Sequence, residues 1–592
     1  MCAKKQNSEF SASDNNRHIH EYVCQLASDV RTASGPRGWV PLSFGIAVAA
    51  TAILSSGNTP ADADSTFGTI GLTQLQLVAP QLTGAGVAVG QVEASTSSSN
   101  INLFEPNSSN DPGAQFTYFD GSGNSSSSYN SADGSWHANY VASFFYGANG
   151  AGVSPGVSHV FVYQEGDYYF DIYKNYAPAS TSSGSIPAVV NQSFVYSNET
   201  PSQITSLDQT WDNYAAEYNT LYVSAVGDGG SGFQTSTSPV SYINPPSDAY
   251  NGIAVAALGG ATGIGPTWDG RSKPDITAPG AYTSYTAPIV SGVATLMEQA
   301  GRGTNLSGPV GLSASDSAIA NGSATAYTTA ATDIRTVKAL LLNGAVKPTG
   351  WTNSYTVNSG TYSYNAVNAN AITPLDPRYG AGVVNAYNSY ENLAGGEHNF
   401  TSTTAQSIAA LPSVTSAPTA NFSGSFSQAA STTNPATITG WNLATIAAST
   451  TSNAVENYDF NLTGTSLNAW DLTATLTWNK DYNASGINHL MLFLLNSSGQ
   501  RVASSTSMLD NVQQININPA LGINSLAPGQ YDLAVEMLGG VNAISTSDTY
   551  ALAWNFVDPT SVPEPTALAI FALGLSLLAV PRKRASGVSI GQ

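Results

Sequence analysis

The chain has 592 residues, of which only 9% are charged, and its formal net charge is −20. Such an acidic surface repels nucleic-acid backbones, so nucleic-acid binding is excluded. The chain has two cysteines, Cys2 and Cys24, both near the N-terminus. We therefore expect stability to come from a large buried core and not from disulfides.

The first residues are typical of a secretory signal. Residues 40–54 are apolar and follow the basic residues Arg31 and Arg37, and Ala61-Asp62-Ala63 supplies an A-x-A cleavage site. We expect residues 1–63 to be a signal or targeting segment, whose removal leaves a chain without cysteine. The region before the apolar stretch is long, so an uncleaved anchor and a later start codon remain alternatives.

Apolar strand-like runs then alternate with helical stretches. The runs lie at residues 87–92, 158–163, 188–193, 221–227 and 253–258. Helices are expected directly after His137 and after Ser284. This alternation predicts one three-layer α/β domain over residues 69–395, with a parallel sheet covered by helices on both faces.

An acid and a base stand in the first half of this domain. The first strand-like run ends at Glu93, and His137 stands in Asp133-Gly134-Ser135-Trp136-His137-Ala138-Asn139-Tyr140-Val141-Ala142-Ser143. The one other histidine between the N-terminal apolar segment and residue 395 is His159, which opens an apolar strand and is expected to be structural. A carboxylate can hold an imidazole tautomer and stabilise the imidazolium. The alternative for Glu93 is an ordinary solvated acid at a strand end.

A candidate nucleophile follows in the second half of the domain. The segment Thr283-Ser284-Tyr285-Thr286-Ala287-Pro288-Ile289-Val290-Ser291-Gly292 places a serine on a strand-to-helix turn. A turn of this kind presents a hydroxyl group at the start of a helix. The alternative is a Ser/Thr-rich loop that happens to end in Ala-Pro.

Together these segments resemble the motifs of the subtilisin-like serine proteases, the subtilases. The serine segment is similar to G-T-S-x-A-x-P with Tyr282 in place of the glycine, and the histidine segment is similar to H-G-T-H-V-A-G. The order acid, histidine, serine is the subtilisin order. The resemblance implies a peptidase in which Ser284 attacks the peptide carbonyl, His137 takes and returns the proton, and Glu93 replaces the usual aspartate.

The resemblance also implies an oxyanion residue and a substrate-binding edge. Subtilases place an asparagine after a buried strand, where this chain has Asp228. An ionised aspartate only accepts hydrogen bonds, so it would serve only when protonated, as in the acid-acting sedolisins, which look similar here. An acid-shifted protease, an enzyme that relies on backbone donors and an inactive protease-like fold all remain open. Ser193 and Gly227 are expected at the edge where an extended peptide adds by backbone hydrogen bonds.

The expected partners follow from this assignment. Protein or peptide substrates are expected, and no cofactor is. Surface carboxylates are present, but no Asp-rich calcium loop is visible, so no metal is expected either.

The character of the chain changes after the α/β domain. Residues 396–449 are rich in Ser, Thr and Ala and are expected to form a linker or edge strands. Over residues 450–560 apolar and polar residues alternate with period two, as in Trp470, Leu472, Ala474, Leu476 and Trp478. This pattern predicts an antiparallel β-sandwich. The segment resembles the jelly-roll-like domains of secreted subtilases, with a role in stability, positioning or binding, for example of polysaccharide.

The C-terminus carries three unlike elements in order. Val562-Pro563-Glu564-Pro565 precedes an apolar run at 566–580, and Arg582-Lys583-Arg584 follows. Residues 562–585 resemble a PEP-CTERM sorting signal, which implies processing by an exosortase-type enzyme in the envelope of a Gram-negative-type bacterium. A helix of the run would be about 22 Å long, shorter than the roughly 30 Å hydrocarbon core. We therefore expect transient membrane contact.

The sequence thus predicts a secreted or envelope-sorted serine endopeptidase. The competing hypothesis is a non-enzymatic surface or matrix protein that keeps the protease fold as a scaffold.

Overall fold

The computed structural model describes residues 66–558. Gaps in the described residues lie at 98–99, 120–124, 174–185, 198, 230–242, 304–329, 352–353, 358–359, 364–369, 372, 408–435, 465–468, 522–523 and 541–542. The described residues belong to one structural unit, 59–592. The predicted signal segment 1–63 and sorting signal 562–585 lie outside them, as does the middle of the Ser/Thr/Ala-rich run. None of the helices within the described ranges has the length and apolar character needed to cross a membrane.

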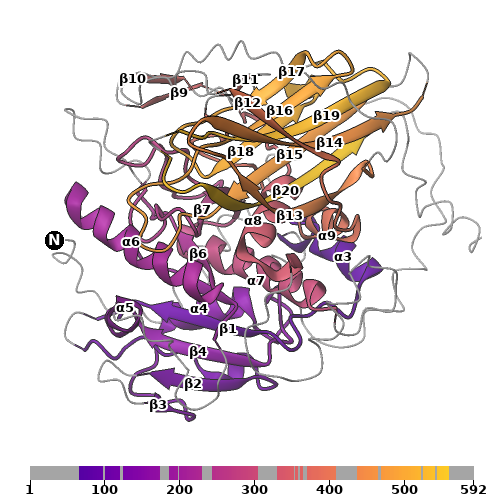
Figure 1. The fold of residues 1–592 in the computed structure, drawn as a ribbon. Coiled ribbons are helices and arrows are strands. Elements are labelled where there is room, and N and C mark those ends of the chain that lie inside the picture. Colours follow the sequence, from indigo (N-terminus) through magenta and orange to yellow (C-terminus); the bar gives the residue numbers. More distant parts are fainter. Residues whose placement is uncertain are drawn as a thin grey trace, which may run out of the picture. The chain divides into compact units, whose positions relative to one another are not determined.

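An eight-stranded sheet lies at the centre of the first domain (Figure 1), with the strand order β3-β2-β4-β1-β5-β6-β7-β8. Its strands are β1 (Ala88–Glu93), β2 (Gln115–Phe119), β3 (Ser125–Ser126), β4 (His159–Gln164), β5 (Val189–Gln192), β6 (Leu221–Ala225), β7 (Ile253–Leu258) and β8 (Ile276–Pro279). All neighbours pair in parallel except β2 and β3. Every residue of β5 and β6 is buried, which means that both faces of the sheet are covered, as parallel sheets require.

Helices pack on this sheet and on one another. They are α3 (Leu72–Val78), α4 (Trp136–Phe145), α5 (Glu165–Tyr173), α6 (Pro201–Tyr218), α7 (Thr283–Gly301), α8 (Ile334–Gly344) and α9 (Ala386–Ala394). α7 packs against β5 to β8, α4 packs against α7, and α5 packs against β4 and β1. The predicted α/β fold with a largely parallel sheet is confirmed.

Local sequence signals set where these helices begin and how closely they pack. Ser135 caps α4 by accepting a hydrogen bond from the Ala138 amide (3.2 Å), and Asp333 caps α8 by accepting from the Arg335 amide (2.9 Å). Gly292 lets α7 approach the loop after α4, because a Cβ there would lie 2.4 Å from the Cβ of Val153.

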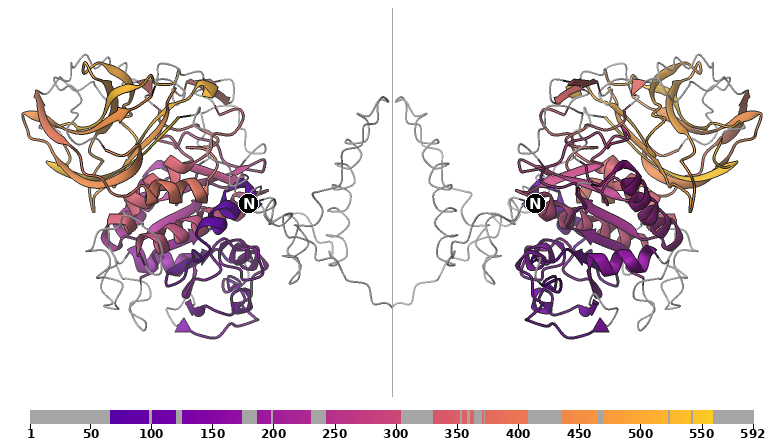
Figure 2. Two further views of the ribbon diagram at one scale, coloured as in Figure 1. Left: turned by 90° about the vertical axis from the view of Figure 1, so that its right-hand side faces the viewer. Right: turned by 90° about the vertical axis from the view of Figure 1, so that its left-hand side faces the viewer.

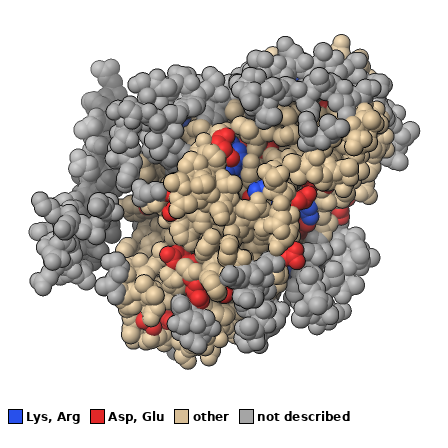
Figure 3. All heavy atoms as spheres, turned by 60° about the vertical axis from the view of Figure 1, so that its left-hand side comes forward, with Lys and Arg blue, Asp and Glu red and all other residues tan. Residues whose placement is uncertain are grey.

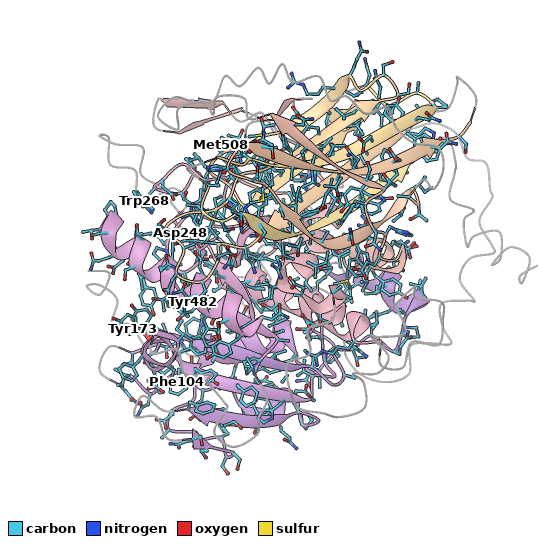
Figure 4. All side chains as sticks on the ribbon, viewed as in Figure 1. Phe104, Tyr173, Asp248, Trp268, Tyr482 and Met508 are labelled. Carbon is cyan, nitrogen blue, oxygen red and sulfur yellow. The ribbon has the colours of Figure 1, made fainter. Side chains whose placement is uncertain are left out.

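The charged segment before α7 forms buried ion pairs. The Nζ of Lys273 lies 2.6 Å and that of Lys338 3.3 Å from the Asp275 carboxylate. Burial alone would raise the pKa of Asp275, but the two lysines outweigh it and hold that pKa below its usual value. Arg271 is buried against the Asp269 carboxylate (2.9 Å) and donates to the carbonyl of Asp248, which is labelled in Figure 4. Lys338 belongs to α8, so its ion pair with Asp275 connects this helix to the residue before β8.

Three further sheets contain the remaining strands (Figures 1 and 2). Their orders are β10-β9, β11-β17-β16-β19-β14-β12 and β13-β20-β15-β18. The strands are β9 (Ser354–Val357), β10 (Gly360–Ser363), β11 (Asn370–Ala371), β12 (Ser402–Ser407), β13 (Thr439–Ala447), β14 (Ser452–Leu462), β15 (Asp471–Trp478), β16 (Leu490–Asn496), β17 (Arg501–Ser505), β18 (Val512–Ile517), β19 (Gly529–Met537) and β20 (Ser547–Val557). All neighbours in the two larger sheets are antiparallel except β11 and β17.

One buried cluster draws side chains from both larger sheets. Tyr458 and Leu533 come from the six-stranded sheet, and Leu476 and Trp554 come from the four-stranded sheet. β12 and β13, which fall within the Ser/Thr/Ala-rich run, are edge strands.

Two threonines on the other face of β15, Thr475 and Thr477, are also buried. The hydroxyl of Thr475 donates to the Asn343 side chain (3.0 Å) and that of Thr477 to the Arg335 carbonyl (2.8 Å). Both acceptors belong to α8. The polar face of the four-stranded sheet therefore packs against the α/β domain by hydrogen bonds.

Candidate active site

The four predicted catalytic residues lie at ends of elements that meet on one edge of the sheet. Glu93 is the last residue of β1, and Asp228 stands three residues after the end of β6. His137 and Ser284 are each the second residue of their helices, α4 and α7. In parallel α/β sheets this edge, at the carboxyl ends of the strands, is where ligands bind.

Glu93 and His137 are in direct contact. The Nδ1 atom of His137 lies 2.8 Å from Oε2 of Glu93, whose side chain is buried, while that of His137 is 19% exposed. A carboxylate only accepts, so Nδ1 donates and the neutral ring keeps Nε2 as its basic nitrogen. This is the acid–histidine geometry that a triad needs.

A second residue of β1 fixes the Glu93 carboxylate. The Nε2 of Gln91 donates to Oε1 of Glu93 (2.9 Å) and to the carbonyl of Ala138 in α4 (3.0 Å). The hydroxyl of Tyr146 donates to the amide oxygen of Gln91. Both oxygens of Glu93 are therefore held in place. The sequence analysis missed Gln91, although residues two apart on a strand share a face and this spacing could have indicated it.

The charges around His137 shift its titration. Burial lowers the pKa of the ring, but the hydrogen bond and charge of Glu93, together with the charge of Asp228, outweigh burial and raise the pKa above its usual value. Asp228 therefore acts on the same site as Glu93. Protonated His137 is favoured up to a higher pH than in a free imidazole.

Ser284 is half-buried, and a chain of hydrogen bonds from β5 holds its backbone. Its backbone carbonyl accepts a hydrogen bond from the hydroxyl of Ser193 (2.9 Å). That hydroxyl in turn accepts a hydrogen bond from the side-chain Nδ2 of Asn191 (2.9 Å). The side-chain oxygen of Asn191 accepts from the hydroxyl of Ser291, two turns along α7 (3.1 Å). Ser193, predicted at the substrate edge, has its side chain turned toward the nucleophile's helix.

The Ser284 hydroxyl makes no hydrogen bond to His137 among the described residues. The His137 ring lies 6.1 Å from the ring of Tyr285, the residue after the serine. Catalytic hydrogen bonds are often long without substrate and tighten when it binds.

Asp228 lies beside the start of α7 and is exposed. Its Oδ1 accepts from both the amide (2.8 Å) and the hydroxyl (2.8 Å) of Thr283. Gly227 precedes it with a φ of +93°, a conformation that favours glycine and turns the chain toward the helix. Oδ1 of Asp228 thus accepts two hydrogen bonds from Thr283.

His159 lies at the other end of the sheet. It pairs with Ala88, five residues before Glu93 along β1, which places it about 16 Å away at roughly 3.3 Å per residue. Its Nε2 lies 2.9 Å from the hydroxyl of Thr117. The structural role of His159 stays a prediction.

Figure 3 shows the charged side chains of one face as small separate groups among mostly uncharged described residues. In the described ranges no group of three or more His, Cys, Asp or Glu side chains could hold a metal ion.

Comparisons with known proteins identify the α/β domain. The model of the subtilase family matches residues 84–382, about half of the chain. No protein with a curated description matches the sequence.

Several solved structures are similar to the chain at low identity. A PatG macrocyclase in complex with peptide is 15% identical, with 57% of this chain and 99% of that chain covered and a TM-score of 0.37. The CspB protease of Clostridium perfringens is 14% identical, with 56% and 99% covered and a TM-score of 0.38. MycP1 from the ESX-1 type VII secretion system is 15% identical, with 55% and 84% covered and a TM-score of 0.33. At these scores the structures add nothing to the assignment of chemistry.

Proposed function

The chain belongs to the subtilase family of serine peptidases, and on this basis we propose that it is an endopeptidase with the triad Glu93, His137 and Ser284. The observation that carries the proposal is the part-buried 2.8 Å contact between Glu93 and His137, whose ring lies 6.1 Å from that of Tyr285, the residue after Ser284.

The proposed reaction follows from the roles of these groups. The Oγ of Ser284 bonds to the peptide carbonyl carbon while its proton passes to Nε2 of His137. The C–N bond then breaks as His137 returns that proton to the leaving amine. Water then attacks the carbonyl carbon of the acyl-enzyme by the same two proton transfers, and the carboxylic acid product is released. Glu93 stabilises the imidazolium that forms in both steps.

The oxyanion of the intermediate would be held by the Ser284 amide and by Oδ2 of Asp228. Oδ1 already accepts two hydrogen bonds from Thr283, so a donor at this position requires a proton on Oδ2. We therefore propose an acid-shifted peptidase whose activity falls as the pH rises through neutrality. The need for a neutral His137 acts in the opposite direction, because the pKa of His137 is raised.

The location and the C-terminal region belong to the same proposal. The N-terminal signal pattern and the C-terminal sorting pattern support a secreted or envelope-sorted protein that an exosortase-type enzyme processes, with transient membrane contact. The cluster shared by the two larger C-terminal sheets supports a β-sandwich. We propose that this sandwich positions the α/β domain or binds a ligand, since it docks on α8 through Thr475 and Thr477.

A second function is favoured by one observation. Asp228 offers only acceptors when ionised, and it occupies the position at which an oxyanion donor is needed. A protein with this site could retain the protease fold as an inactive surface or matrix scaffold.

Labelling with a serine-directed fluorophosphonate from acidic to alkaline pH separates the two functions. An endopeptidase is expected to label at Ser284, with labelling lost in Ser284→Ala and declining above neutral pH. A folded protein that labels at no pH would leave the scaffold as the function.

A further inference from the structure

Four aromatic side chains form a continuous surface beside the catalytic residues. We define this aromatic shelf as Trp136, Tyr140, Tyr282 and Tyr285. Trp136 is 62% exposed, Tyr140 51% and Tyr282 48%. Exposed apolar side chains that adjoin one another are typical of binding surfaces.

Tyr285 joins the shelf together. Its ring centroid lies 5.6 Å from those of Tyr140 and Tyr282 and 5.7 Å from that of Phe144, the half-buried support of the shelf. Trp136 lies 6.2 Å from Tyr140. Distances of this size are those of favourable aromatic pairs, so the rings hold one another in place.

The shelf lies against His137. The His137 ring is 5.6 Å from Trp136 and 6.1 Å from Tyr285. Asp228 contacts Thr283, the residue between Tyr282 of the shelf and the nucleophile. His137 must pass its proton to the leaving amine, so the residue that carries this amine approaches the His137 side. The rings packed on His137 therefore border the leaving group.

We propose that the aromatic shelf binds the side chain of the residue directly after the scissile bond and selects large apolar or aromatic residues there. The inference rests on the proposed peptidase function and adds its substrate class. The shelf contains no charged side chain, and an aromatic or branched apolar side chain would cover ring surface that water now contacts. Burial of one such side chain predicts a preference of about tenfold or more in kcat/KM over alanine at this position.

A peptide library tests this selection on the full-length protein. The library is digested at the pH of fastest fluorophosphonate labelling, and the residue after each cut is read by mass spectrometry. Phe, Tyr, Trp and Leu are expected to be enriched after the cut. Two matched peptides that differ only in Phe or Ala at this position give the kcat/KM ratio.

Variants assign the selection to the shelf. Trp136→Ala and Tyr140→Ala are expected to lower the Phe/Ala ratio toward one, whereas Tyr140→Phe keeps the ring and should keep the ratio. Tyr482→Ala is the matched control, because Tyr482 is 43% exposed in the C-terminal region and is labelled in Figure 4.

The outcomes separate the inference from the function on which it rests. Cleavage without enrichment, enrichment of Lys or Arg, or a Phe/Ala ratio unchanged in both alanine variants would overturn the role of the shelf while the peptidase stands. The absence of both cleavage and labelling in a folded protein would overturn the peptidase and the shelf together.

Discussion

Shortening Glu93 by one methylene tests whether the length of this acid matters. Glu93→Asp restores the residue that subtilases usually carry, so motif comparison alone predicts an unchanged or faster enzyme. The structure predicts the opposite. The backbone at Glu93 is fixed at the end of β1, where Val92 and Glu93 pair with β4, and its carboxylate lies 2.8 Å from Nδ1 of His137.

The size of the effect follows from that geometry. Removal of a methylene withdraws the carboxylate by roughly 1.5 Å and stretches the contact to about 4.3 Å, beyond hydrogen-bond reach. A lost hydrogen bond to a charged group costs about 1.5 to 3 kcal/mol. At about 1.4 kcal/mol per factor of ten, labelling of Ser284 should slow about 10- to 100-fold. The bond from Gln91 to the second oxygen would be lost as well.

The assay is the second-order rate constant for fluorophosphonate labelling over a pH series, with folding checked by thermal unfolding. Glu93→Gln is the matched control, because it keeps the length and removes the charge. Glu93 is among the groups that raise the pKa of His137. The pH at which the labelling rate of Glu93→Gln reaches half of its maximum should therefore be lower than in the parent. An aspartate variant that labels as fast as the parent would show that the 2.8 Å contact does not set reactivity.

Three further outcomes are expected. Asp228→Asn supplies an oxyanion donor at any pH, so labelling above pH 7 should increase about 10²-fold or more, the effect of one such donor; an unchanged alkaline rate would contradict the role of Asp228. Ser193→Ala removes a hydrogen bond to the Ser284 carbonyl. A hydrogen bond contributes about 1 kcal/mol, so labelling should slow several-fold. An unchanged rate would mean that this bond does not position the nucleophile. Burial raises the pKa of Glu298 in α7 from 4.5 to about 7 despite the opposing charge of Arg302, so the stability it contributes is present below pH 4.5 and lost as the pH rises through 7, about 3 kcal/mol in all. The free energy of unfolding in urea should therefore fall less between pH 5 and pH 8 in Glu298→Gln than in the parent or in the exposed control Glu217→Gln. Equal decreases in all three proteins would refute this.

The sequence alone predicted the main strands and helices of the α/β domain, and the strand and helix ends at which the candidate catalytic residues lie. Strand and helix periods are local properties, so the strand ending at Glu93 and the helices that begin at Trp136 and Thr283 could be predicted from neighbouring residues. The inward face of β15 was predictable for the same reason, and Leu472 and Leu476 lie in the buried cluster.

Contacts between distant segments were not predictable, because nothing local marks them. Thr475 and Thr477 have the polarity of solvent-facing residues, yet they are buried against α8 because hydrogen bonds to Asn343 and Arg335 satisfy their hydroxyls. The strand pattern indicated which residues share a face of β15. Only the packing of α8 on that face decided that Thr475 and Thr477 are buried from solvent.

The site divides in the same way. The resemblance of three segments to subtilase motifs, in the subtilisin order, indicated the candidates Glu93, His137 and Ser284. Only the tertiary structure decided that Gln91 holds the acid in place and that Tyr285 joins rings of α4 and α7 into a surface. Side chains from elements far apart in sequence meet only after the chain has folded, and their distances then set what the site can bind.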